Sequence, residues 1–117
     1  LVTDKIVELS DGADVVLHDA MALQLVQGAE SLARRSGNNR LAIVLHDIQD
    51  YHATTADLAR LKAEADIGLL ALYHLVPAPR NAMAISAFNG GLPEGALITE
   101  DGMVISLPAN SNEITVD

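Results

Sequence analysis

Residues 51–74, with the sequence YHATTADLARLKAEADIGLLALYH, decide the fold of this chain. Thr54 offers a hydroxyl group that can cap a helix, and Asp57 follows three residues later, which is the spacing of a capping box. Apolar residues then recur at the spacing of one helix face, at Leu58, Leu61 and Ala65. The pattern predicts a helix over residues 55–66.

A buried strand is predicted directly after this helix. Gly68 breaks the helical pattern, and residues 69–73 form the uninterrupted apolar run that is typical of a strand covered on both faces. His74 lies at the end of this run, and His52 lies just before the helix. Ligands in α/β sheets gather at the carboxyl ends of strands, so we expect the two imidazoles to be neighbours in a metal or catalytic centre.

The residues before this stretch predict a second strand and helix. Residues 13–18 form an apolar, β-branched run after the turn residues 10–12, and His18 is the last residue of the run. A helix is predicted over residues 19–35, with apolar positions at Leu25, Ala29, Leu32 and Ala33. Residues 41–45 are compatible with either a strand or a helical turn.

The C-terminal third predicts an antiparallel hairpin. Pro77 and Pro79 prevent further ladder pairing after the central strand. The dipeptide Asp101-Gly102 then separates two apolar runs, residues 96–99 and residues 103–107. The alternation of strands and helices, followed by this hairpin, indicates the α/β class.

The composition limits the possible functions. The chain has 117 residues, enough for a single domain or half-domain over 1–117, and no cysteine, which excludes thiolate metal sites and disulfides. Sixteen acidic against seven basic residues give a net charge of −9, which disfavours nucleic acid as a partner. We expect a soluble protein without a membrane span, and both cytoplasm and periplasm remain open as its location.

Each candidate residue also has a purely structural interpretation. His18 can be a buried ring bonded to the backbone, His52 a capping residue, and His74 a strand-end side chain in contact with water. Asp19 can cap the following helix. The residues alone leave these alternatives open.

Four short segments, taken in order, resemble motifs of one protein family. Residues 12–21, GADVVLHDAM, resemble a strand that runs into a His-Glu-Ala-Thr motif, and residues 51–65 resemble a histidine element that opens an alanine-rich helix. Residues 69–74 are similar to a strand that supplies a metal-binding histidine, and residues 100–108 to a terminal hairpin. The order resembles the C-terminal half of metallo-β-lactamase-fold hydrolases, in the branch of ribonuclease Z and arylsulfatase-like enzymes.

This resemblance implies a fold and an activity. The fold would be half of an αββα sandwich, and the complete enzyme would be a dinuclear zinc hydrolase of phosphate, sulfate or acyl esters. His74 would bind one zinc ion, His52 would face the substrate, and His18 with Asp19 would form the proton-transfer pair.

Several positions depart from the family pattern. Asp19 replaces a glutamate, Met21 a threonine, and Ala53 a hydroxyl residue. The main metal-binding motif His-x-His-x-Asp-His is not found in these residues. The resemblance therefore implies that an N-terminal half, in a parent chain or a second polypeptide, completes the enzyme, that this chain is inactive alone, and that a small-molecule ester is its substrate.

Two other classes of protein remain open at this stage. Residues 20–35, 41–45 and 90–93 resemble segments of haem-binding modules of the GlcG/HbpS type, which are non-catalytic. A structural half-domain would instead expose an apolar sheet face that pairs with a partner or with a second copy. We therefore also expect the chain to form a homo-oligomer.

Overall fold

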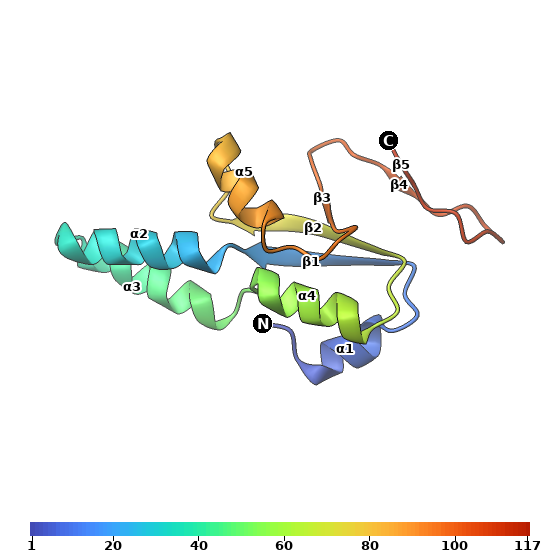
Figure 1. The fold of residues 1–117 in the computed structure, drawn as a ribbon, viewed down its shortest axis with the longest axis horizontal. Helices are drawn as coiled ribbons and strands as arrows, with labels where there is room; N and C mark the ends of the chain where they lie inside the picture. The colour runs from blue at the N-terminus through green and yellow to red at the C-terminus, as the bar shows by residue number, and fades with distance from the viewer.

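The computed structural model describes all residues 1–117 and shows an α/β fold with two small sheets (Figure 1). The larger sheet has three parallel strands in the order β1 (Val15–Met21), β2 (Leu69–Val76) and β3 (Leu97–Ile98). The central strand β2 pairs with β1 along its whole length except at His74. The predicted α/β class is thus confirmed.

Five α-helices and one 3-10 helix surround or extend this sheet. Their bounds are α1 (Asp4–Ser10), α2 (Leu23–Arg35), α3 (Asn39–Asp47), η1 (Ile48–Asp50), α4 (Thr55–Glu64) and α5 (Ala82–Asn89). Figure 1 shows α1 and α4 on one side of the sheet, whereas α2 and α3 extend together beyond its end. None of the helices has both the length and the apolarity required to cross a membrane.

Helix α4 begins where the sequence predicts. The Thr54 hydroxyl accepts a hydrogen bond from the backbone N–H of Asp57 at 3.1 Å, and the Asp57 carboxylate accepts one from the N–H of Thr54 at 2.9 Å. The capping box is therefore complete. The helix ends at Glu64, two residues earlier than predicted, because Ala65 adopts an extended conformation.

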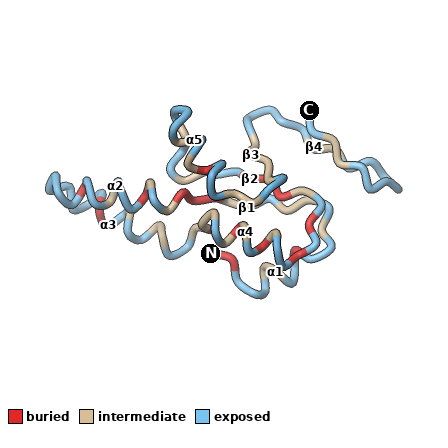
Figure 2. The backbone as a smooth tube through the Cα atoms, in the orientation of Figure 1, coloured by how far each residue is buried: buried red, intermediate tan, exposed pale blue.

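The core lies between α4 and the sheet. Leu58 and Leu61 of α4 are fully buried against Leu70 and Leu72, which alternate along β2. Figure 2 shows red segments in α4 and along the strands of this layer, and further ones in α2, α3 and α5. Burial of each leucine side chain contributes about 1.5–3 kcal/mol, so this layer holds the strand and helix together.

The first strand extends further than the sequence predicts. β1 continues to Met21, and the Met21 N–H donates to the carbonyl of Ala53 at 2.7 Å. The helix predicted over residues 19–35 therefore begins only at Leu23, and its N-cap residue Ala22 makes no side-chain cap. As a correction, His18 lies inside β1 rather than at its end, and Asp19 does not cap the helix.

The ambiguous residues 41–45 are helical. Asn38 accepts a hydrogen bond from the N–H of Leu41 at 3.2 Å and so caps α3, which contains the whole segment. Local turn chemistry therefore decided between the two predictions, since an Asx cap directs the following residues into a helix.

The predicted hairpin around Asp101-Gly102 is wrong in its pairing. Leu97–Ile98 joins the free edge of β2 in parallel as β3. Strand β4 (Ile105–Ser106) pairs in an antiparallel manner with β5 (Thr115–Val116). Gly102 does adopt a positive φ of 93°. The turn signal was correct locally, but the open edge of the central strand provided a better partner for the first apolar run.

Candidate functional site

His52 and His74 meet at the carboxyl end of the parallel strands. Their ring centroids are 5.4 Å apart, and the rings are nearly perpendicular, at 78°. His52 comes from the loop before α4, and this loop is joined to β1 by the bond between Met21 and Ala53. His74 comes from β2, which lies beside β1. The parallel pairing thus brings together two residues that are 22 positions apart in the sequence.

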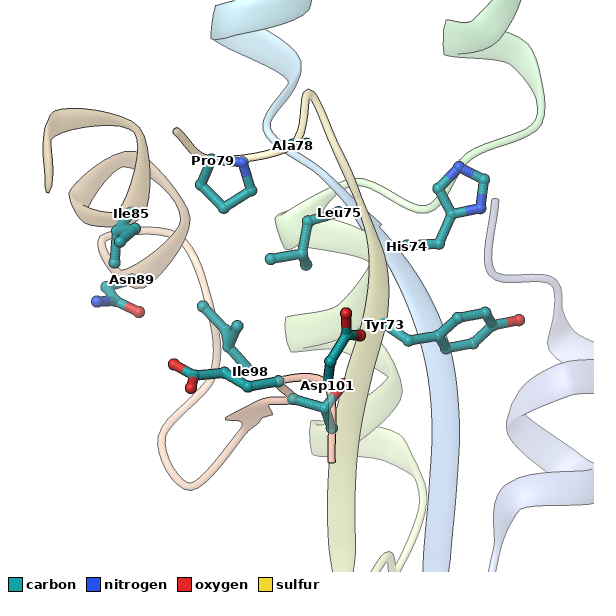
Figure 3. Close-up of a pocket in the computed structure, with 11 residues that line it drawn as sticks. Tyr73, His74, Leu75, Ala78, Pro79, Ile85, Asn89, Ile98 and Asp101 are labelled. Atoms are coloured by element: carbon teal, nitrogen blue, oxygen red, sulfur yellow. The ribbon is translucent and has the colours of Figure 1, made fainter. Parts of the chain in front are cut away.

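A β-bulge orients His74. Asp19 of β1 is opposite Tyr73, and Ala20 is opposite Leu75, so His74 has no partner in the ladder. Its φ angle is 47°, a left-handed value that is uncommon for a residue with a side chain. Such strain, of about 1–3 kcal/mol, clusters at functional sites, and bulges redirect side chains. Figure 3 shows Tyr73 and His74 on the same side of β2, opposite Leu75.

The ring of His52 is fixed by a backbone hydrogen bond. Its Nδ1 lies 2.9 Å from the carbonyl oxygen of Ile48. A carbonyl only accepts, so Nδ1 carries the proton and Nε2 is the available nitrogen. The ring of Tyr51 packs beside it, with centroids 4.8 Å apart. The sequence analysis did not select Tyr51, although its position next to His52 was a usable signal.

The ring of His18 contacts both the backbone and the side chain of Asp19, and its Nδ1 lies 3.0 Å from the Asp19 carbonyl oxygen, which fits the structural interpretation of His18. The Nδ1 of His18 lies 2.9 Å from Oδ1 of Asp19, and the histidine side chain is only 13 % exposed. The second carboxylate oxygen of Asp19 accepts a hydrogen bond from the N–H of Ala53 at 3.0 Å. Asp19 therefore connects His18 to the loop that carries His52.

The fourth histidine lies elsewhere. His46 is exposed on α3 and contacts the carboxylate of Glu30 at 3.3 Å. Hydrogen bonds from Arg34, and then from Gln49, hold the pKa of Glu30 below its ordinary value. This cluster joins α2 to α3 and takes no part in the histidine site.

A cavity of about 710 Å³ lies on the Leu75 side of β2, and His74 is one of its lining residues although its ring points to the other side of the strand (Figure 3). Part of its wall is apolar, formed by Leu75, Ile85 and Ile98, and Glu100 and Asp101 add two carboxylates (Figure 3). The sequence analysis missed this cavity because its walls come from β2, α5 and the turn after β3. No spacing in the sequence connects these three segments.

The side chains of the chain do not form a metal site by themselves. No group of three or more His, Asp or Glu side chains is arranged to hold a metal ion. A tightly held zinc ion needs three or four protein ligands, and here His52 and His74 form the only close histidine pair.

Comparison with known proteins gives no family assignment. No protein family matches the chain, and no curated protein shows significant sequence similarity to it.

Proposed function

We propose that the chain is the C-terminal portion of a metal-dependent hydrolase with the metallo-β-lactamase fold, similar to the ribonuclease Z and arylsulfatase-like branch. In this proposal the sheet and its covering helices α1 and α4 form half of an αββα sandwich. The observation that carries the proposal is the contact between His52 and His74, with ring centroids 5.4 Å apart at the carboxyl end of the sheet.

The side chains present fit one part of a zinc site. The His74 ring is exposed and strained into its position by the bulge, which suits a ligand to a metal ion. The donor set of this chain is incomplete, so the remaining ligands would come from an N-terminal half in a parent chain or from a second polypeptide. Two zinc ions in the complete enzyme would lower the pKa of a shared water toward neutrality.

His52 would transfer a proton to or from the substrate. With Nδ1 bound to the Ile48 carbonyl, Nε2 accepts a proton when the ring is neutral and donates it when the ring is cationic. The fixed ring orientation removes rotational freedom that a reaction would otherwise have to restrict. His52 is therefore the proposed catalytic residue that faces the ester.

His18 and Asp19 would support this step. Oδ1 of Asp19 lies 2.9 Å from Nδ1 of His18, which is hydrogen-bonded to the Asp19 carbonyl, and Oδ2 of Asp19 accepts a hydrogen bond from the N–H of Ala53, directly after His52. A carboxylate that orients an imidazole determines its tautomer and stabilises its cationic form. The pair would act as a proton-transfer pair, and Asp19 would position the loop of His52.

The cavity on the Leu75 side of β2 supports a small-molecule ester as a ligand, although the ring of His74 points to the other side of this strand. Its apolar wall can accommodate an organic group of a small ester. Glu100 and Asp101 in the same cavity would repel a polyphosphate backbone, in agreement with the net charge of −9. Nucleic acid is therefore the less suitable substrate.

Zinc titration with His74→Ala and His52→Ala variants tests the site. In this chain we expect weak zinc binding that shifts the NMR signals of the His74 imidazole, and loss of that shift in His74→Ala. In a complete enzyme formed with the complementary half, His74→Ala should lose about one zinc ion, whereas His52→Ala should keep the metal and lose about 10²–10⁴-fold in turnover.

His46→Ala is the matched control, because His46 is an exposed histidine outside the site. It should leave zinc binding and turnover unchanged. Zinc retained in full by His74→Ala would refute the ligand assignment. Tight stoichiometric zinc, or haem, in this chain alone would refute the proposal of a shared site.

A further inference from the structure

The cavity on the Leu75 side of β2 has the size of a small-molecule site. Its volume of about 710 Å³ lies within the range of about 300–1,000 Å³ that such sites occupy. Its walls come from β2, from α5 and from the turn after β3. Since the ring of His74 points to the other side of β2, the chemistry of the cavity is separate from that of the histidine pair (Figure 3).

One part of the cavity wall is apolar. Figure 3 shows Leu75 pointing from β2 toward the side where α5 carries Ile85, and Ile98 lies between them. Ala78 and Pro79, in the segment between β2 and α5, extend this apolar wall. Each methylene group that leaves water for such a surface strengthens binding. The wall therefore suits a ligand with a short hydrocarbon chain.

The side chains that bring charge to the cavity are acidic. Glu100 and Asp101 line it, and no lysine or arginine does. Neither carboxylate takes part in an ion pair of the chain. Arg80 follows the lining residue Pro79, but it forms no ion pair with either of them. Both carboxylates are thus available to a cation from solution.

The combination of an apolar wall and two carboxylates distinguishes between kinds of cation. A calcium ion takes six to eight oxygen ligands, whereas most of this wall is carbon. A quaternary ammonium group has no N–H to donate and is best held by aromatic faces, but Tyr73 points to the other side of β2. A primary ammonium group offers three N–H donors to carboxylates, and its alkyl chain suits the apolar wall.

We propose that this cavity binds a small primary amine. The ammonium group donates hydrogen bonds to the carboxylates of Glu100 and Asp101, and the hydrocarbon chain lies against the apolar wall. The net charge of −9 favours the approach of a cation. The proposal specifies the charge of the organic group that the cavity takes. It needs neither zinc nor a complementary half, so it stands or fails separately from the hydrolase proposal.

NMR titration of the isotopically labelled chain with four hexyl compounds tests the charge of the ligand. Hexylammonium should shift the amide signals of residues 98–101 with a Kd of about 1 mM. Hexanol and hexyltrimethylammonium should bind at least about tenfold more weakly, and hexanoate should cause no shift. No binding of hexylammonium, or an equal affinity for hexanoate or hexyltrimethylammonium, would overturn the proposal.

Removal of the two carboxylates tests their role. The double variant Glu100→Gln with Asp101→Asn should bind hexylammonium at least about tenfold more weakly. Glu113→Gln with Asp117→Asn is the matched control, because it removes the same charge from residues that do not line the cavity. This control should keep the affinity of the unmodified chain. An equal loss in both double variants would show that only net charge acts, and it would overturn the site.

The apolar wall is tested on α5. Ile85→Ala should weaken the binding of hexylammonium by about threefold or more and leave that of methylammonium unchanged, since only the longer amine reaches the wall. Met83→Ala is the matched control, because Met83 is 77 % exposed on the same helix and does not line the cavity. Far-UV circular dichroism should show the same helix content in both variants. Equal hexylammonium affinities of the two variants would overturn the placement of the hydrocarbon chain.

Discussion

The α4–β2 layer and the α2–α3 arm (residues 23–50) have the same helical spacing of apolar residues, but these residues are buried in the layer and partly exposed in the arm. In α4 the apolar residues Leu58 and Leu61 are completely buried against β2. In α2 the equally periodic Leu32 is 60 % exposed. The difference teaches that periodicity predicts a helix and its apolar face, whereas burial requires another element at the correct place. The arm has only one such neighbour, its partner helix.

Truncation of a leucine in the layer should have the largest effect on stability. Leu61→Ala removes a fully buried side chain and should lower the free energy of unfolding by about 2–5 kcal/mol. Ile43→Ala, on an exposed position of the arm, should change it by no more than about 0.5 kcal/mol. Urea unfolding of the two variants measures both values, and equal losses would contradict the contrast between layer and arm.

Two glycine substitutions, one beside the sheet and one in the arm, should change the stability of the chain in opposite directions. A Cβ at Gly68 would lie 2.6 Å from the backbone oxygen of Asp14, so Gly68→Ala should destabilise the sheet by about 1–3 kcal/mol. A Cβ at Gly28, inside α2, would meet no atom within 4 Å, so Gly28→Ala should stabilise the chain by about 0.5–1 kcal/mol. Thermal unfolding of both variants checks the signs. A stabilising Gly68→Ala would mean that β1 and β2 are not packed as closely as described.

Lowering the pH should destabilise the α2–α3 arm before the α4–β2 layer. This is the smallest of the expected effects. Hydrogen bonds from Arg34 and Gln49 lower the pKa of Glu30 in the folded chain. The corresponding stability is therefore fully present above the ordinary carboxyl pKa of 4.5 and is lost as pH falls through the lowered value. Hydrogen exchange of α2 and α3 amides should increase over this acid range.

Glu30→Gln is the control for this acid effect, because its amide does not titrate. Its α2 and α3 amides should exchange with little added dependence on pH in the same range. Protection in the unmodified arm that stays constant down to the most acidic pH would contradict the role of Glu30.

Much of the site could be predicted from residues 51–74. The capping box at Thr54 and the apolar run of β2 are local signals, and they correctly placed His52 before a helix and His74 near a strand end. The bulge at His74 could not be predicted, because it depends on the pairing of Asp19 and Ala20 with β2. The same holds for the cavity, whose walls come from three separate segments.

By itself the sequence determined the α/β class, the start of α4, the central strand and the candidate residues of the histidine site, because caps and periodicity act over a few neighbouring residues. Only the tertiary structure decided that β1 continues to Met21, that Leu97–Ile98 joins β2, and that the arm stands free. These features depend on backbone hydrogen bonds and packing between residues far apart in the chain, and local patterns carry no information about such partners.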